Sequence, residues 1–208
     1  MKKKQILPDG YKPTIEKAKD YIAQPYSSNP IVGDIKERTI VKLFKEIPEN
    51  KDISNVLVKC VTLNSLASTN IIDVFYIAEH IQKLKIDDRL KQGELKLVDE
   101  IGKKINVGNS KRSHYSFASK YCSYHQPDLY SIYDRYVALV LTELQKRDSF
   151  SDFKRAEELK NYERYMKVLE DFRNFYGFSE NELSKKDLDK YLWLFGKECV
   201  SEYNIRKK

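Results

Sequence analysis

Lys120 and Asp134 are the two side chains in the middle of the chain whose types suit covalent chemistry. Lys120 ends Ser116-Phe-Ala-Ser-Lys120, inside a stretch from Ile101 to Pro127 that has no acidic residue, and Asp134 follows in Tyr133-Asp134-Arg135. A lysine amine with a lowered pKa can attack an electrophilic carbon and form a Schiff base. A carboxylate can stabilise positive charge at a reacting centre or deprotonate the attacking group. The two residues therefore form the first candidate site.

Each of these side chains also has an ordinary structural explanation. Ser131-Ile-Tyr-Asp134 has the spacing of a helix capping box, and a carboxylate in the first turn of a helix is stabilised by the helix dipole. The chain has 38 Lys and Arg against 31 Asp and Glu, so one lysine among them is often a solvent-facing or phosphate-facing side chain. The residue types alone leave both interpretations open.

Basic and aromatic side chains alternate in the acid-free stretch. The cations are Lys103, Lys104, Lys111, Arg112 and Lys120, and the rings are those of Tyr115, Phe117, Tyr121, Tyr124 and His125. Such cations bind phosphates with release of counterions, and aromatic faces stack on unpaired bases. The i, i+4, i+7 spacing of Phe117, Tyr121 and Tyr124 also fits the buried face of a helix, and basic runs are often solvated surfaces. The stretch permits nucleic-acid binding without requiring it.

Length and composition indicate a single folded domain over residues 1–208. The chain is 41% hydrophobic and 33% charged, which is enough apolar material for a substantial core. Cys60, Cys122 and Cys199 are too few and too far apart for a zinc or iron–sulfur site, so we expect neither a metal nor a cofactor. No 18 apolar residues run together and the first residues lack a signal-peptide core, so we expect no membrane partner and a cytoplasmic location.

Helical periodicity recurs along the chain and β-type alternation is missing, so we expect an all-α fold. Apolar stripes and proline breaks predict helices at about 13–23, 33–47, 56–66, 71–84, 93–105, from 116, 134–146 and 151–176, with a turn at 106–110. The 56–66 helix is apolar on most sides and is expected to be buried. Gly177 before Phe178 predicts a left-handed cap, and Ser184-Lys-Lys-Asp187 predicts the capping box of a last helix.

A third position is independent of the lysine and the aspartate. Leu66-Ala-Ser-Thr-Asn70-Ile71 lies between the apolar helix and the amphipathic helix that follows it. Asn70-Ile-Ile-Asp73 has the spacing of an N-cap residue and its partner, so capping is one explanation for the turn. Capping is compatible with a further role, because the polar side chains of a cap also face solvent.

The order of this turn, Lys120 and Asp134 on a helical frame resembles the helix-hairpin-helix (HhH-GPD) DNA glycosylases, most of all the 8-oxoguanine branch, over residues 56–144. The resemblance implies a compact two-lobed helical domain, with lobes at 50–130 and at 1–49 with 131–208. It implies a duplex DNA partner with one flipped base. Ser68, Thr69 and Asn70 would fill the gap that the base leaves, Lys120 would be the attacking amine, and Asp134 would stabilise the sugar.

The hairpin departs from the family pattern, since no Gly-x-Gly turn precedes Lys120 and the interval from Lys120 to Asp134 is shorter than usual. The DNA contacts would then come from the neighbouring residues Gly108, Asn109, Ser110, Lys111, Arg112 and His114. The candidates for stacking on a base are Tyr115, Phe117 and Tyr121. We expect an enzyme that flips a modified or damaged base and cleaves its N-glycosidic bond, with or without strand cleavage. The alternatives are a non-catalytic nucleic-acid-binding module and a helical protein-interaction module.

Overall fold

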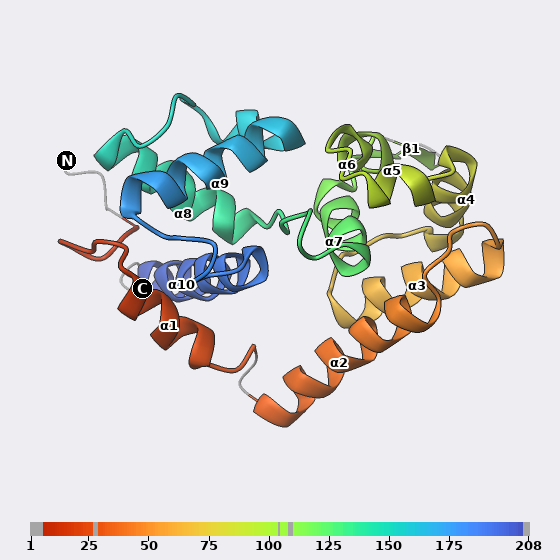
Figure 1. The fold of residues 1–208 in the computed structure, drawn as a ribbon, viewed down its shortest axis with the longest axis horizontal. Helices are drawn as coiled ribbons and strands as arrows, with labels where there is room; N and C mark the ends of the chain where they lie inside the picture. The colour runs from red at the N-terminus through yellow and green to blue at the C-terminus, as the bar shows by residue number, and fades with distance from the viewer. Residues whose placement is uncertain (1–5, 27–28, 104, 108–109, 206–208) are drawn as a thin grey trace. The chain divides into compact units, whose positions relative to one another are not determined.

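The computed structural model describes residues 6–26, 29–103, 105–107 and 110–205, which form two compact units (Figure 1). The split unit consists of Met1–Gln24 together with Tyr133–Lys208, and the continuous unit consists of Pro25–Ile132. The predicted lobe boundary near residue 50 therefore falls inside the continuous unit. The reason is that the helix before this boundary packs against the two helices Ile53–Leu66 and Tyr115–His125.

Six helices and a β-hairpin make up the described part of the continuous unit. They are α2 (Pro30–Glu46), α3 (Ile53–Leu66), α4 (Val74–Leu84), α5 (Asp87–Lys91), α6 (Lys96–Ile101), strands β1 (Ile105–Val107) and β2 (Ser110–Arg112), and α7 (Tyr115–His125). Three helices begin at a side-chain cap that accepts a backbone N–H: Asn29 for α2, Asp52 for α3 and Asp73 for α4. The class is thus predominantly helical, as the periodicity indicates.

Two expected helix boundaries in this unit are wrong. Pro30 was expected to interrupt the chain, but it is the first residue of α2, where its missing N–H costs no hydrogen bond. The helix expected at 93–105 stops at Ile101, and the segment after it pairs with residues 110–112 as an antiparallel hairpin. Ile105, which continues the helical spacing after Ile101, begins strand β1 instead and is paired with Arg112.

The core of the continuous unit lies between α3, α4, α6 and α7, and α3 packs most extensively against α4. Its buried apolar side chains are Val56, Cys60, Leu63, Ile77, Ala78, Ile81, Leu97, Val98, Ile101, Phe117, Ala118, Tyr121 and Cys122. The expectation that α3 is buried on most sides is wrong for Val58 and Val61, which are both 48% exposed. Helix α3 therefore has one solvent face and one core face.

The split unit is formed by α1 (Ile15–Ala23), α8 (Arg135–Asp148), the 3-10 helix η1 (Ala156–Lys160), α9 (Tyr162–Tyr176) and α10 (Lys185–Ile205). Both predicted caps are confirmed. Gly177 ends α9 with a φ of 74°, and the Phe178 N–H donates to the Arg173 carbonyl. The Ser184 hydroxyl accepts from the Asp187 N–H at 3.1 Å, and the Asp187 carboxylate accepts from the Ser184 N–H at 3.2 Å.

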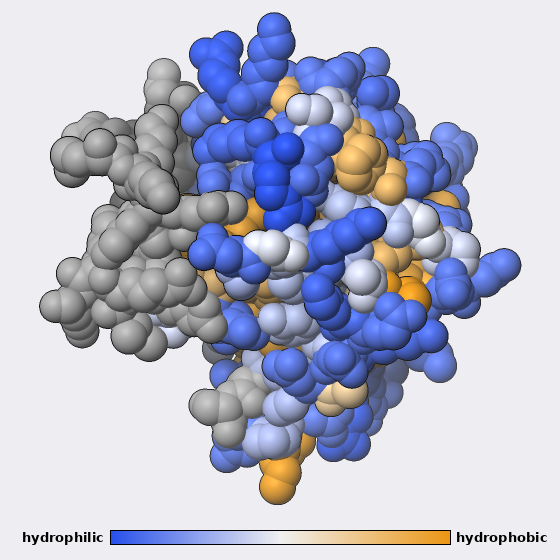
Figure 2. Space-filling model, turned by 90° about the vertical axis from the view of Figure 1, so that its left-hand side faces the viewer, coloured by the Kyte–Doolittle hydropathy of each residue, from blue (hydrophilic) through white to orange (hydrophobic). Residues whose placement is uncertain are grey.

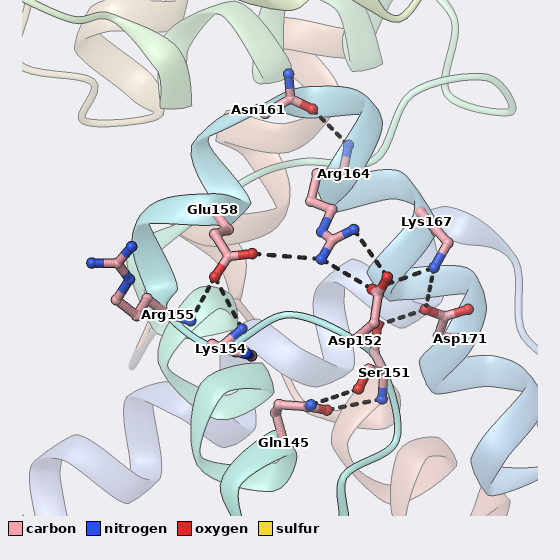
Figure 3. Close-up of polar contacts among 10 residues, drawn as sticks. All are labelled: Gln145, Ser151, Asp152, Lys154, Arg155, Glu158, Asn161, Arg164, Lys167 and Asp171. Atoms are coloured by element: carbon pink, nitrogen blue, oxygen red, sulfur yellow. Dashed lines mark hydrogen bonds and ion pairs between the residues drawn. The ribbon is translucent and has the colours of Figure 1, made fainter.

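Polar contacts fix the connection between α8 and α9 (Figure 3). The Gln145 amide bonds both the N–H and the carbonyl of Ser151, at 2.8 and 2.6 Å. The Arg164 guanidinium lies 3.1 Å from an Asp152 oxygen, and the Glu158 carboxylate accepts two backbone N–H groups at the start of η1. These contacts replace the single long helix expected from 151 with η1 followed by α9.

The surface is largely hydrophilic on the face shown in Figure 2, where hydrophobic residues appear as small separate patches. This distribution follows from a composition in which one third of the residues are charged. Within the described residues, no helix combines the length and the apolar character needed to cross a membrane.

Candidate functional site

The Ser-Thr-Asn turn joins α3 to α4 and is braced by one side chain of α3. Asn64 Oδ1 accepts from the Ile71 N–H at 2.8 Å and from the Thr69 hydroxyl at 2.9 Å, while Asn64 Nδ2 donates to the Ile71 carbonyl at 3.0 Å. Ser68 and Asn70 are exposed and both have left-handed backbone conformations, with φ of 51° and 56°. Such conformations cost energy for residues other than glycine, so the brace holds the turn in one strained shape.

The capping explanation for Asn70 is wrong. Helix α4 begins at Val74, and its N-cap is Asp73, whose carboxylate accepts from the Tyr76 N–H at 3.4 Å. Asn70 lies too far upstream to reach the first-turn amides of α4. Its side chain is therefore available for another use.

The structure brings Lys120 to this turn. Lys120 lies on α7, and its Nζ donates to the carbonyl of Ala67 at 3.1 Å. Ala67 is the C-cap of α3 and directly precedes Ser68. The Lys120 side chain is half-buried, so it is both positioned by protein and within reach of solvent. Two elements that the sequence separates by about 50 residues thus meet in space.

The other predicted DNA contacts are residues between Gly108 and His114. Gly108 and Asn109 lie outside the described residues, and for Ser110, Lys111 and Arg112 the structure describes the backbone strand only. In that strand Arg112 is paired with Ile105. His114 is half-buried at the N-cap position of α7, and its N–H donates to the Gly102 carbonyl at 3.0 Å. The hairpin therefore enters α7 through a short, tightly bonded junction.

The three aromatic residues predicted to stack on a base are part of the core. Tyr115, Phe117 and Tyr121 are 7%, 1% and 0% exposed. The Phe117 and Tyr121 rings lie 5.7 Å apart, and the Tyr121 hydroxyl donates to Asn50 Oδ1 at 2.5 Å. Because protein covers these ring faces, a base cannot stack on them in this arrangement. The i, i+4 spacing of Phe117 and Tyr121 is here the spacing of an inward helix face.

Asp134 belongs to the split unit, whereas Lys120 belongs to the continuous unit, so each is described by itself. The Asp134 carboxylate is the N-cap of α8 and accepts from the Tyr136 N–H at 2.9 Å. Ser131 is thus not the N-cap, although the capping-box spacing pointed to it. The expected capping box is therefore wrong, but Asp134 has a structural role as the cap itself, and its negative charge is stabilised by the positive end of the helix dipole.

A second polar cluster, centred on Lys59 of α3, lies buried in the continuous unit. Lys59 Nζ donates to the carbonyls of Ile47 and Glu49 at 3.1 and 3.0 Å and to Asn50 Oδ1 at 2.7 Å. It also lies 3.3 Å from His125 Nε2. Three oxygens match the three N–H groups of an ammonium, so a fully buried cation is satisfied by protein alone.

Burial dominates the electrostatics of this cluster. Loss of water lowers the pKa of the Lys59 ammonium to about 8, against an opposing contribution from the Asp87 carboxylate. Burial, and then the Lys59 charge, lowers the pKa of His125 to about 3, so the imidazole is neutral at pH 7. The Asp87 carboxylate accepts from the Asn50 N–H at 3.0 Å and from Asn50 Nδ2 at 2.7 Å. Asn50 therefore links the acid to the cation.

Sequence reasoning did not find Asn64 or the Lys59 cluster. Lys59 does carry a signal, because it is a lone charged residue in the apolar run Val56–Val61, on a helix expected to be buried. Asn64 carries none, since an asparagine near a helix end is ordinary. In the part of the chain that the structure describes, no three His, Cys, Asp or Glu side chains are placed to hold a metal ion.

These observations define a predominantly helical protein of two units, in which a braced, exposed turn and a half-buried lysine share one surface of the continuous unit. The family model HI_0787_N, which describes an N-terminal domain, matches residues 18–129, more than half of the 208-residue chain. The chain belongs to this family. The matched region contains both the Ser68–Asn70 turn and Lys120, and it ends before Asp134.

A protein of Haemophilus influenzae strain Rd that carries the name "Uncharacterized protein" is 46% identical to the chain over 136 residues. The similarity covers 65% of this chain and 63% of that protein, so the chain spans less than two thirds of the length of this relative. No solved structure matches the chain.

Proposed function

We propose that the protein is a DNA glycosylase-like enzyme that binds duplex DNA, flips a modified or damaged base and cleaves its N-glycosidic bond. The contact between Lys120 and Ala67 carries the proposal. The sequence resemblance requires a nucleophilic lysine and a gap-filling turn to act on one nucleotide, and the bond of 3.1 Å from Lys120 Nζ to the carbonyl of Ala67, the residue before Ser68, supports this.

The surface beside the turn supports this proposal. Ile72, Phe75 and Tyr76 follow the turn directly and are 71%, 51% and 48% exposed. Exposed apolar side chains next to a polar turn are costly in water, and DNA-binding proteins insert such side chains between base steps to unstack the duplex. In the proposed complex Ser68 and Asn70 occupy the position that the flipped base leaves. The exposed side chains of Ile72, Phe75 and Tyr76 keep the neighbouring base pairs apart.

In the proposed reaction the neutral amine of Lys120 forms a bond to the anomeric carbon of the deoxyribose. The bond from that carbon to the base breaks, and the base leaves with the electron pair and takes up a proton. The amine then loses a proton, and the bond from the anomeric carbon to the ring oxygen breaks with its electron pair on that oxygen, which takes up a proton. The product is a protonated Schiff base, from which elimination cleaves the strand. The role that the resemblance gives Asp134 is to stabilise positive charge on the sugar.

Borohydride trapping on DNA that contains an abasic site tests the lysine without knowledge of the damaged base. We expect a covalent protein–DNA product, because borohydride reduces a Schiff base to a stable amine. Lys120→Ala should abolish the product, and Lys103→Ala, which removes an exposed lysine from the same acid-free stretch, should not. A product that survives Lys120→Ala would contradict the assignment.

Asp134→Asn tests the carboxylate separately from the cap. Asparagine is as good an N-cap as aspartate, so α8 should keep its start and the melting temperature should change little. Base release from a panel of lesion-containing duplexes should be lost if the charge stabilises the sugar. Lost stability with retained base release would identify Asp134 as a cap only.

A non-catalytic nucleic-acid-binding module is the second candidate. The Lys120 contact is compatible with it, because an ammonium on the Ala67 carbonyl stabilises the C-terminal end of α3 and so gives the lysine a role without catalysis. This candidate predicts salt-dependent duplex binding with no base released and no trapped product.

A further inference from the structure

The continuous unit has an open pocket of about 1070 Å³. Neither Lys120 nor Ala67 is among the residues that line it. The last turns of α2, α4 and α7 contribute to its wall, as do residues 48–51 and the start of α5. Its lining includes five lysines, all of them exposed: Lys45, Lys51, Lys83, Lys85 and Lys91. Its volume is slightly above the range of about 300–1,000 Å³ that is usual for small-molecule sites.

The charges of this pocket do not cancel. The acidic lining residues are Glu49, Asp87 and Asp88. Lys51 pairs with Glu49 at 3.1 Å, and Lys83 pairs with Glu79 at 3.0 Å. The Asp87 carboxylate accepts hydrogen bonds from the backbone N–H and the side-chain amide of Asn50. Among the described residues, Lys45, Lys85 and Lys91 form no ion pair, while Asp88 and Asp87, whose charge also acts on Lys59, are the lining carboxylates that oppose them. The lining as a whole has five lysines against three carboxylates.

Lys59, which contacts the lining residues Glu49 and Asn50, adds a further positive charge next to the pocket. A helix C-terminus normally carries a partial negative charge, which would repel an anion. Here the carbonyls of Ile47 and Glu49, just past the end of α2, are engaged by the buried Lys59 ammonium. Lys59 therefore offsets these carbonyls, and an anion in the pocket meets an excess of positive charge from the lining lysines.

Lys85 is held at the rim at a cost to the backbone. It is the C-cap of α4 and has a φ of 50°, a left-handed conformation that glycine or asparagine adopts more readily. A long side chain in this position is a local disadvantage for the fold. A use for its charge in the pocket would explain it.

Two ring side chains complete the wall. Tyr124 and His125 line the pocket and are partly exposed, and the Tyr124 hydroxyl is fixed by the Glu37 carboxylate at 2.7 Å. Aromatic faces hold the flat base or the sugar of a nucleotide, while lysines hold phosphates. The rings of the wall therefore suit the nucleoside part of a nucleotide, and the lysines of the rim suit its phosphates.

We propose that this pocket binds a nucleoside phosphate, with the phosphates on Lys45, Lys85 and Lys91 and the nucleoside against Tyr124 and His125. The site is independent of the proposed glycosylase chemistry, because it uses none of the residues assigned to that reaction. Two sources have this chemistry, a free nucleotide and a nucleic-acid strand.

Isothermal titration calorimetry of the full chain with ATP and, separately, with single-stranded oligothymidylate tests the proposal. The double variant Lys45→Ala/Lys91→Ala should weaken binding about tenfold or more, because two charge-assisted phosphate contacts are lost. The matched control is Lys36→Ala/Lys96→Ala, which removes two exposed lysines that lie outside the lining. ATP binding with this pattern assigns a free nucleotide, and binding of oligothymidylate alone with the same pattern assigns a strand.

Lys85→Gly separates binding from folding, since it removes the charge and relieves the backbone. It should raise the melting temperature and weaken binding at the same time. Binding of neither probe would overturn the proposal, as would equal losses in the test and control double variants.

Discussion

Two lysines of the continuous unit, Lys59 and Lys120, each donate to the carbonyl at the C-cap of a helix, in opposite surroundings. Lys59 is fully buried and reaches the Ile47 carbonyl at the end of α2 and two further oxygens. Lys120 is half-buried and reaches the Ala67 carbonyl at the end of α3. In both places the ammonium complements the negative end of a helix dipole.

The difference shows that a lowered pKa does not identify a reactive lysine. Burial lowers the pKa of Lys59 to about 8, which favours a nucleophilic amine, but protein surrounds that amine and three oxygens hold it. Lys120 is less buried than Lys59, and a substrate can approach it beside the exposed turn. Access therefore separates the structural lysine from the candidate nucleophile.

The largest effect expected from this comparison is on stability. Lys59→Met should lower the free energy of unfolding by about 2–4 kcal/mol, because it leaves the buried Asn50 Oδ1 and the partly buried carbonyls of Ile47 and Glu49 without this donor. Lys120→Met should cost less than about 1 kcal/mol, because water can replace its contact. Urea denaturation of both variants measures the difference. Equal losses would remove the distinction between the two lysines.

The next effect is a pH dependence that comes from the Lys59 cluster and not from the turn. Because the pKa of His125 is lowered to about 3 in the folded protein, its imidazole takes up a proton near pH 6.5 only in the unfolded chain. Stability should then fall by about 1.4 kcal/mol per pH unit as the pH drops below 6.5. His125→Gln should flatten this slope between pH 6.5 and 4.5. A slope that persists unchanged in the variant would assign it to other groups.

On the Lys120 side, the brace of the turn should have an intermediate effect. Asn64→Ala removes three hydrogen bonds from the turn and should cost about 1–2 kcal/mol of stability. If the turn acts on DNA, the affinity of the variant for duplex DNA should also fall. This affinity is measured at a temperature at which the variant is fully folded, so that unfolding cannot account for the loss. Asn55→Ala, an exposed position on the same helix, is the control.

The smallest effect concerns the strain of the turn. Ser68→Gly should raise the stability by about 0.5–1 kcal/mol, because glycine adopts the left-handed conformation without a steric penalty. The same change should weaken binding to gapped or abasic duplex, because the gap-filling side chain is lost. Thermal unfolding and a binding titration give the two values, and a gain in both would show that the strain serves no contact with DNA.

Local signals in the sequence were sufficient for the helical class, for the caps at Gly177 and Ser184, and for the placement of Lys120 on a helix. Each depends on residues within one or two helical turns of one another. The hairpin at 105–112 was missed because its strands have three residues each, too few for alternation to show. The contact of Lys120 with Ala67 and that of Lys59 with His125 were beyond sequence reasoning, since tertiary packing alone brings such distant residues together.

The split unit has a consequence for the order in which the chain folds. Its first helix, α1, packs against α10, and the Tyr11 ring before α1 stacks on Phe195 with centroids 4.1 Å apart. A ribosome releases α1 long before α10 exists, whereas residues 25–132 form one continuous compact unit. Domains fold as units during synthesis, so the inserted unit closes first and the N-terminal helix waits, with its apolar side uncovered, for the last helix of the chain.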